Sequence, residues 1–169
     1  VEIFQSLGAR VVIGGQTMNP SAQEILEVVN KTKAANVIVL PNNKNIIPVA
    51  QQLDSLSDKF IYVVPTTSVP QGIAALLVFN PELGPDDNLA VMLNATEEIR
   101  TGEVTHAVRS TAVDEMHIKK GETIGILDGE LVTSGKTTEG IVLDLLDRIS
   151  PEEDNIITIY RGVEAPQED

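Results

Sequence analysis

Cysteine and tryptophan are absent from this 169-residue chain, and histidine occurs only twice. The lack of cysteine excludes disulfides, thiolate nucleophiles and cysteine metal ligands. No apolar run approaches the roughly 18 to 20 residues that a membrane-spanning helix needs, and no signal peptide is visible. These absences predict a cytoplasmic protein without a transmembrane segment.

Aromatic residues are also scarce, at 3% of the chain, although hydrophobic residues reach 42%. The chain therefore has enough apolar material for a core, and that core is expected to be aliphatic. Its length fits one domain, or one domain followed by a smaller unit.

Basic residues are outnumbered by acidic residues in the second half of the chain. Residues 1–80 carry five basic and five acidic side chains, whereas residues 81–169 carry seven basic and twenty acidic ones. The net charge of −13 therefore arises entirely from the second half. Such a surface repels nucleic acid and anionic membranes. It either keeps the protein soluble or attracts a basic protein partner.

An initiator methionine is missing, and the chain opens inside a helical pattern. Its last residues follow directly after a predicted strand. We therefore expect a piece of a longer protein.

Helical and strand patterns alternate over the first 100 residues. Strands are expected at residues 11–13, 37–40 and 60–64. A first helix is expected to end at Gly8, and a second to start at Ser21 with Glu24 completing a capping box. The other expected helix starts are Asn43 or Asn45 with Pro48 in the first turn, Pro70 for residues 71–79, and Asp86 or Asp87. Residues 1–100 are predicted to form an α/β unit with a mainly parallel sheet and helices on both faces.

The pattern changes to period two after Gly102. Strands are expected at residues 103–111, 116–119, 123–127, 131–133 and 155–160. Asp128 and Gly129 predict a type I′ hairpin, and Thr137 or Thr138 is expected to cap a helix. Residues 102–169 are therefore predicted to form a smaller, β-rich α+β unit that is cut short.

Polar loops follow the three strands expected in the first unit. We call their residues the polar edge: Gly14, Gly15, Gln16, Thr17, Asn19, Ser21, Asn42, Asn43, Lys44, Thr66 and Thr67. The carboxyl ends of parallel strands meet at one edge of a sheet, where such folds bind ligands. Backbone N–H groups at helix starts, together with Lys44, would suit a carboxylate, a phosphate or a partner's loop. Alternatively, these residues only cap helices and close turns.

Patterns typical of catalysis or metal binding are missing. Gly135, Lys136 and Thr137 suggest a phosphate loop, but that motif requires a glycine at position 130, where this chain has a glutamate. His106 and His117 lie on separate expected strands, with His106 half-buried, and a metal site needs three or four converging ligands. We predict no catalytic residue and no metal site in this chain.

Five segments then occur in a fixed order: GGQTMNPS at 14–21, LPNNKNII at 40–47, VPTTSVPQG at 64–72, EVTHAVR at 103–109 and IKKGETIGI at 118–126. Together they closely resemble the C-terminal region of the kinase subunit of bacterial fatty acid kinase, which belongs to a dihydroxyacetone kinase-like (Dak phosphatase, DegV-related) family. The resemblance covers essentially the whole chain. It implies an α/β fold related to DegV, and members of the family continue past residue 160 with another helix and strand.

The resemblance also implies a function. In this family ATP and magnesium bind an N-terminal kinase domain, and the aspartate cluster that holds the metal has no counterpart here. The kinase phosphorylates a fatty acid presented by a separate DegV-like fatty-acid-binding protein, giving an acyl phosphate for phospholipid synthesis. The C-terminal region is expected to dock that binding protein, without catalysis and without a cofactor of its own.

Two alternatives stay open. The chain is either a module that binds a fatty acid or a phosphorylated metabolite, or an independent enzyme of the dihydroxyacetone kinase type. In DegV proteins a polar loop after an early strand helps to hold the fatty-acid carboxylate, and Thr17, Ser21 or Thr66 matches that loop by position. The sequence shows no large apolar cavity for an acyl chain.

Overall fold

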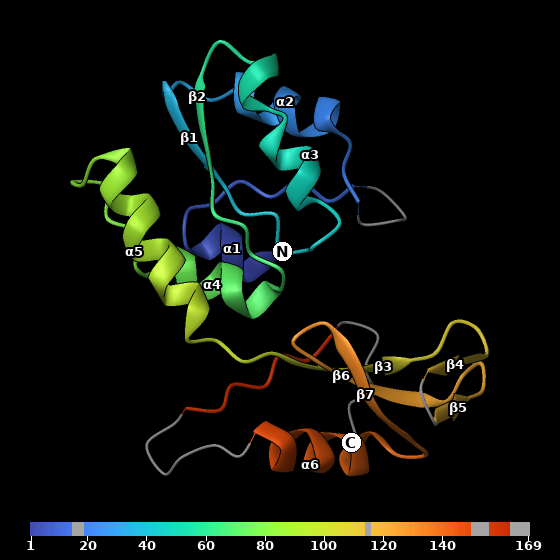
Figure 1. The fold of residues 1–169 in the computed structure, drawn as a ribbon. Coiled ribbons are helices and arrows are strands. Elements are labelled where there is room, and N and C mark those ends of the chain that lie inside the picture. The colour runs from blue at the N-terminus through green and yellow to red at the C-terminus, as the bar shows by residue number, and fades with distance from the viewer. Residues whose placement is uncertain (15–18, 114–115, 150–155, 163–169) are drawn as a thin grey trace. The chain divides into compact units, whose positions relative to one another are not determined.

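The computed structural model describes residues 1–14, 19–113, 116–149 and 156–162. The chain divides into two compact units, Val1–Ile99 and Arg100–Asp169. Figure 1 shows the helices and strands of each unit.

The first unit is built mainly from helices around a small parallel sheet. Its elements are α1 (Glu2–Ser6), α2 (Ala22–Asn30), β1 (Asn36–Val39), α3 (Ile47–Gln51), a 3-10 turn η2 (Asp54–Leu56), β2 (Phe60–Val63), α4 (Val69–Leu77) and α5 (Pro85–Glu97). β1 and β2 pair in parallel, with Asn36 opposite Phe60 and Val39 opposite Val63.

Helices cover both faces of this two-stranded sheet. Val37 and Val39 of β1 pack against a core cluster that contains buried residues of α2 and α3. Ile38 and Leu40 pack against a second cluster, which contains Val64 together with residues of α4 and α5. Alternate residues of a strand point to opposite faces, so β1 contributes to two cores at once. The unit is therefore α/β, as expected.

The mainly parallel sheet is a wrong prediction, because β1 and β2 form the one parallel pair among the described residues. The run at residues 11–13 is not a strand. Val12 packs against the α2–α3 core, but Ile13 is 53% exposed. An apolar run this short can bury one side chain without pairing its backbone, and hydropathy alone does not distinguish the two outcomes.

Several helix ends agree with the sequence. α1 ends in a Schellman motif, in which Gly8 has a φ of 85° and Ala9 N–H donates to the Phe4 carbonyl at 2.9 Å. α2 begins with the predicted capping box between Ser21 and Glu24. Pro48 lies in the first turn of α3, where its missing N–H costs nothing.

Other helix starts differ from the prediction by a few residues. Asn43 does not cap α3, because its Oδ1 accepts from Asn45 N–H at 2.9 Å and closes a turn before the helix. Ser68 is the N-cap of α4, slightly earlier than expected. Gly84 is the N-cap of α5, which places Asp86 and Asp87 in the first turn, where their charge still favours the helix dipole.

Lys59 connects two segments of the first unit. Its Nζ donates to the Thr32 carbonyl at 2.7 Å, to Thr32 Oγ1 at 3.1 Å and to the Ala34 carbonyl at 2.8 Å. These acceptors lie between the end of α2 and the start of β1, whereas Lys59 directly precedes β2. One ammonium group therefore supports the point where the parallel pair begins.

Lys59→Met is expected to destabilise the first unit by about 1 kcal/mol, since hydrogen bonds from a partly exposed charged donor are lost while the aliphatic stem is kept. Urea denaturation followed by the amide NMR peaks of residues 36–39 and 60–63 measures the effect. Lys33→Met is the control, because Lys33 is exposed and makes no hydrogen bond or ion pair with described residues. Equal effects of the two variants would contradict this role of Lys59.

The second unit is β-rich and antiparallel. Its elements are β3 (Gly102–His106), β4 (Thr111–Val113), β5 (Met116–Ile118), β6 (Thr123–Leu127), β7 (Glu130–Gly135) and α6 (Thr138–Ile149). One sheet has the order β3-β6-β7, and β4 pairs with β5 separately. α6 begins after Thr137, whose hydroxyl accepts from Gly140 N–H at 3.2 Å, as predicted for a cap. The pKa of the Asp144 carboxyl on α6 is lowered, mainly by a hydrogen bond from the Thr133 side chain and to a smaller extent by one from Arg148.

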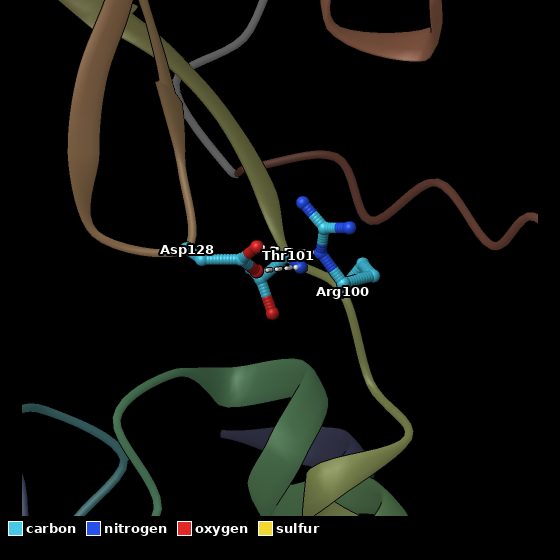
Figure 2. A network of polar contacts seen from close by, with 3 residues as sticks. All are labelled: Arg100, Thr101 and Asp128. Carbon is cyan, nitrogen blue, oxygen red and sulfur yellow. Dashed lines mark hydrogen bonds and ion pairs between the residues drawn. The ribbon is translucent and has the colours of Figure 1, made fainter. Parts of the chain in front are cut away.

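The hairpin between β6 and β7 confirms the predicted turn. Asp128 and Gly129 have φ values of 49° and 85°, and Leu127 pairs with Glu130. Two residues of positive φ define a type I′ turn. The Asp128 carboxylate also accepts from Arg100 Nε at 2.6 Å and from Thr101 N–H at 2.8 Å (Figure 2). The turn residue thus anchors the chain segment that leads into β3.

Two strand predictions in this unit need correction. The expected strand at 103–111 divides into β3 and β4, because Ala107 is buried and pairs with the β5–β6 turn through Gly121 N–H at 2.7 Å and the Glu122 carbonyl at 2.9 Å. The expected strand at 155–160 is not formed: Ile156 is 92% exposed, and Asn155 lies outside the described residues. A segment with alternating apolar residues forms a strand only where another strand is available for pairing.

Candidate functional site

The carboxyl ends of β1 and β2 bring two members of the polar edge together. Asn42 N–H donates to Thr66 Oγ1 at 2.9 Å, and the Thr66 hydroxyl donates to Asn42 Oδ1 at 2.8 Å. Thr66 is completely buried. The second and third polar loops are therefore adjacent, as parallel strands require.

Asn42 also lies directly against α4. A Cβ added to Gly72 would overlap Asn42 Oδ1 and lie 2.7 Å from Asn42 Cγ. Asn42 has a φ of 55°, a left-handed conformation that asparagine tolerates better than most residues. Asn42, Thr66 and Gly72 thus form one packed contact, which we call the Asn42 lock. Its polar groups bind each other inside the protein.

Neighbouring members of the polar edge are held in local turns. The Asn43 side chain closes the turn to Asn45 N–H. Thr67 donates its backbone N–H and its hydroxyl to Gln71 Oε1, at 2.8 and 2.9 Å. Because Gln71 lies in the first turn of α4, this pair fixes the approach to that helix. These contacts match the capping alternative more closely than a free set of ligand groups.

Lys44 differs from these residues. Its side chain is exposed and makes no hydrogen bond or ion pair with the described residues. It sits on the loop whose backbone the Asn42 lock and the Asn43 turn hold in place. The loop therefore presents one positive charge from a fixed position, which suits recognition of an anionic group.

The first polar loop is closed at its two described ends. A Cβ at Gly14 would collide with the backbone of Asn19 and Pro20, so only glycine allows this approach. Ser21 donates its backbone N–H and its hydroxyl to the Glu24 carboxylate. These two hydrogen bonds lower the pKa of the Glu24 carboxyl, the backbone one more than the hydroxyl one. Gly15, Gln16 and Thr17 lie outside the described residues, so their predicted binding role stays a prediction.

Acid–base groups are not gathered at the described part of this edge. Among the residues that the structure describes, no group of three or more histidine, aspartate or glutamate side chains is arranged to hold a metal ion. In the same part of the chain, every helix is too short or too polar to cross a bilayer.

A second site could not be recognised from the sequence. His117, Lys119 and Lys136 line a cleft of about 430 Å³ in the second unit. His106, predicted to be half-buried, is exposed, and its Nδ1 lies 3.5 Å from the hydroxyl of Thr123, which also lines the cleft. The sequence offered one signal here, the run Gly135-Lys136-Thr137, which was set aside because a phosphate loop needs a glycine at position 130.

Comparison with known proteins identifies the class. The family model for the C-terminal region of FakA-like proteins (fatty acid kinase, A-subunit-like) matches residues 1–169. The chain therefore belongs to the FakA-like C-terminal family. This agrees with the resemblance carried by the five sequence segments.

Individual relatives belong to Bacillus and Staphylococcus. The chain is 43% identical over 169 residues to Protein YloV of Bacillus subtilis, covering 99% of this chain and 31% of that protein. It is 41% identical over 165 residues to an uncharacterized protein of Staphylococcus haemolyticus, covering 97% of this chain and 30% of that protein. It is 38% identical over 167 residues to an uncharacterized protein of Staphylococcus aureus strain USA300, covering 98% of this chain and 30% of that protein. The chain thus spans about a third of the length of these relatives.

Proposed function

We propose that this chain is a non-catalytic docking domain of a fatty acid kinase-like protein. It binds a DegV-like fatty-acid-binding protein, and a kinase domain elsewhere in the longer protein phosphorylates the fatty acid that this partner carries. The observation that carries the proposal is the family match over residues 1–169. ATP and magnesium belong to the kinase domain in this proposal, and the complex works in the cytoplasm.

The polar edge supports the proposal by its chemistry. Its described side chains are amides, hydroxyls and one free ammonium group, which recognise a partner by hydrogen bonds and charge. Asn42, Asn43 and Thr67 are already engaged within the chain, so they shape the edge and are not free to bind. Among the described side chains of the polar edge, Lys44 is then the most available to a partner.

Lys44→Ala is expected to weaken binding of the DegV-like fatty-acid-binding protein by about fivefold, equivalent to roughly 1 kcal/mol. Lys44→Glu should weaken it further, because the new charge repels the same anionic group. Isothermal titration calorimetry with the fatty-acid-loaded partner measures both changes. The fold should survive, since the Lys44 side chain supports no other described residue.

Lys33→Ala is the matched control, because Lys33 is another exposed lysine of the same unit that lies outside the polar edge. A partner affinity that Lys44→Ala and Lys44→Glu leave unchanged would overturn the proposed docking surface. Asn42→Ala is a poor test, since it breaks the Asn42 lock and confuses loss of binding with loss of the fold.

A small-ligand module is the second candidate, and the cleft in the second unit favours it. Native mass spectrometry of the purified 169-residue chain separates the two ideas. A co-purifying fatty acid or phosphorylated metabolite would support the ligand module, whereas a ligand-free chain that binds the partner protein would support docking.

A further inference from the structure

The cleft of the second unit lies where several strand ends meet. β6 begins at Thr123, β7 ends at Gly135, and the two residues pair across the sheet. The turn between β5 and β6 supplies Lys119 and Glu122, and the segment after β7 supplies Lys136. Residues separated by up to 19 positions in the sequence therefore line one cleft of about 430 Å³.

The lining of the cleft is more basic than the unit as a whole. Residues 100–169 carry seven basic residues, four arginines and the lysines at 119, 120 and 136, against fifteen acidic residues. Two of these lysines line the cleft, and the third directly follows Lys119. His117 lines it as well and offers a ring N–H in its neutral form. The local charge is thus opposite in sign to that of the unit.

One carboxylate also lines the cleft. Glu122 Oε2 accepts from the backbone N–H of Lys119 at 2.9 Å. This bond closes the β5–β6 turn, together with Glu122 N–H donating to the Lys119 carbonyl at 3.0 Å. Glu122 therefore holds the turn that carries Lys119, and two ammonium groups outnumber its single charge.

The cleft also has a buried polar side chain. Thr123 is only 5% exposed, and its hydroxyl lies 3.5 Å from His106 Nδ1. A hydroxyl has one donor and two acceptor positions. A single long contact with His106 leaves Thr123 capacity for a bond to a molecule in the cleft.

We propose that this cleft binds the phosphate group of a small phosphate monoester. Lysine is a common point-charge ligand for phosphate, and a histidine N–H and the Thr123 hydroxyl supply directional donors. The cleft is open, with His117, Lys119 and Lys136 exposed at its surface, and has room for a small phosphate ester. A metal cation is disfavoured by the two lysines, and a nucleic-acid polyanion by the acidic remainder of the unit. The cleft is lined by residues of the second unit, whereas Lys44 belongs to the first, so the Lys44 variants leave every lining residue of the cleft unchanged.

The test is a titration of the ¹⁵N-labelled 169-residue chain with glycerol 3-phosphate, inorganic phosphate and glycerol, followed by amide chemical shifts. We expect saturable shifts at Gly121, Thr123 and Gly135 with both phosphates, at roughly millimolar dissociation constants, and none with glycerol. Tighter binding of glycerol 3-phosphate than of inorganic phosphate would show that the cleft recognises more than the anion. Absence of saturable shifts at these amides would overturn the proposal.

Variants separate a built site from general charge attraction. Lys119→Ala and Lys136→Ala should each weaken binding about fivefold, whereas the matched control Lys120→Ala should change it less than about twofold. Thr123→Val, which keeps the side-chain shape, should weaken binding while amide shifts in the free protein change only near positions 106 and 123. An equal loss in Lys119→Ala and Lys120→Ala would mean that the phosphate binds through the general field of the lysines, and the proposed site would be wrong.

Discussion

Gly125→Ala is expected to destabilise the second unit by about 2 to 3 kcal/mol, which makes it one of the two largest effects that the structure predicts. Gly125 is a buried residue of β6, and α6 packs directly over it. A Cβ at this position would lie 2.5 Å from Thr133 Cγ2, 2.8 Å from Ile141 Cγ2 and 3.3 Å from Leu145 Cδ2.

The loss of stability in Gly125→Ala is large because the added Cβ would meet side chains of both the neighbouring strand and the helix. Thr133 belongs to β7, whereas Ile141 and Leu145 are the buried residues of α6. Ile141 and Leu145 are less than 5% exposed, so neither can rotate into solvent. An added methyl group therefore has to push the helix away from the sheet, and interiors this closely packed resist such a movement.

Urea denaturation followed by the amide peaks of β6 and α6 measures this loss, and the peaks of the first unit serve as an internal reference. Gly162→Ala is the matched control: it makes the same change where nothing lies within 4 Å of the added Cβ. Retention of the wild-type midpoint in Gly125→Ala would mean that α6 does not pack against β6 as closely as described.

Gly72→Ala is expected to destabilise the first unit by about 2 kcal/mol, although alanine normally favours a helix over glycine by roughly 1 kcal/mol. Gly72→Ala is expected to lower the stability, against the helix preference of alanine, because the new Cβ would occupy the place of the Asn42 side chain. The Asn42 side chain can move only by breaking the hydrogen bond that its Oδ1 accepts from the buried Thr66 hydroxyl. Loss of a buried hydrogen bond adds to the steric cost.

A double-mutant cycle tests this explanation. Asn42→Gly removes the side chain while tolerating the φ of 55°, at a cost of about 1 kcal/mol for the Thr66 bond. In that background Gly72→Ala should become neutral or slightly stabilising, because only the helix preference remains. The free energy of unfolding from urea titrations checks the cycle. If Gly72→Ala costs the same with and without Asn42, the Asn42 lock is not the cause.

Local features of the chain were predictable because they depend on residues close in sequence. The Schellman motif at Gly8, the capping box of Ser21 and Glu24, and the type I′ turn at Asp128 each need only a few neighbouring residues. Backbone sterics and local hydrogen bonds decide such features wherever they occur.

Strand pairing was predicted less well for the same physical reason. The apolar residues at 11–13 and 156–160 have strand-like patterns, yet neither run is paired in the described structure. A strand is completed by hydrogen bonds to a distant segment, and composition does not report whether that segment is available. The number and direction of strands therefore depend on tertiary contacts.

The features of the candidate sites also fall into those that the sequence determined and those that the tertiary structure decided. The sequence alone determined that polar loops follow the apolar runs, that the excess acid lies after residue 80, and which family the five segments resemble. Only the tertiary structure decided that Asn42 and Thr66 bind each other, that Lys44 stays free of the described residues, and that Lys119 and Lys136 share a cleft. Whether a polar side chain is engaged inside the fold or left for a ligand depends on what the folded chain brings within hydrogen-bond distance.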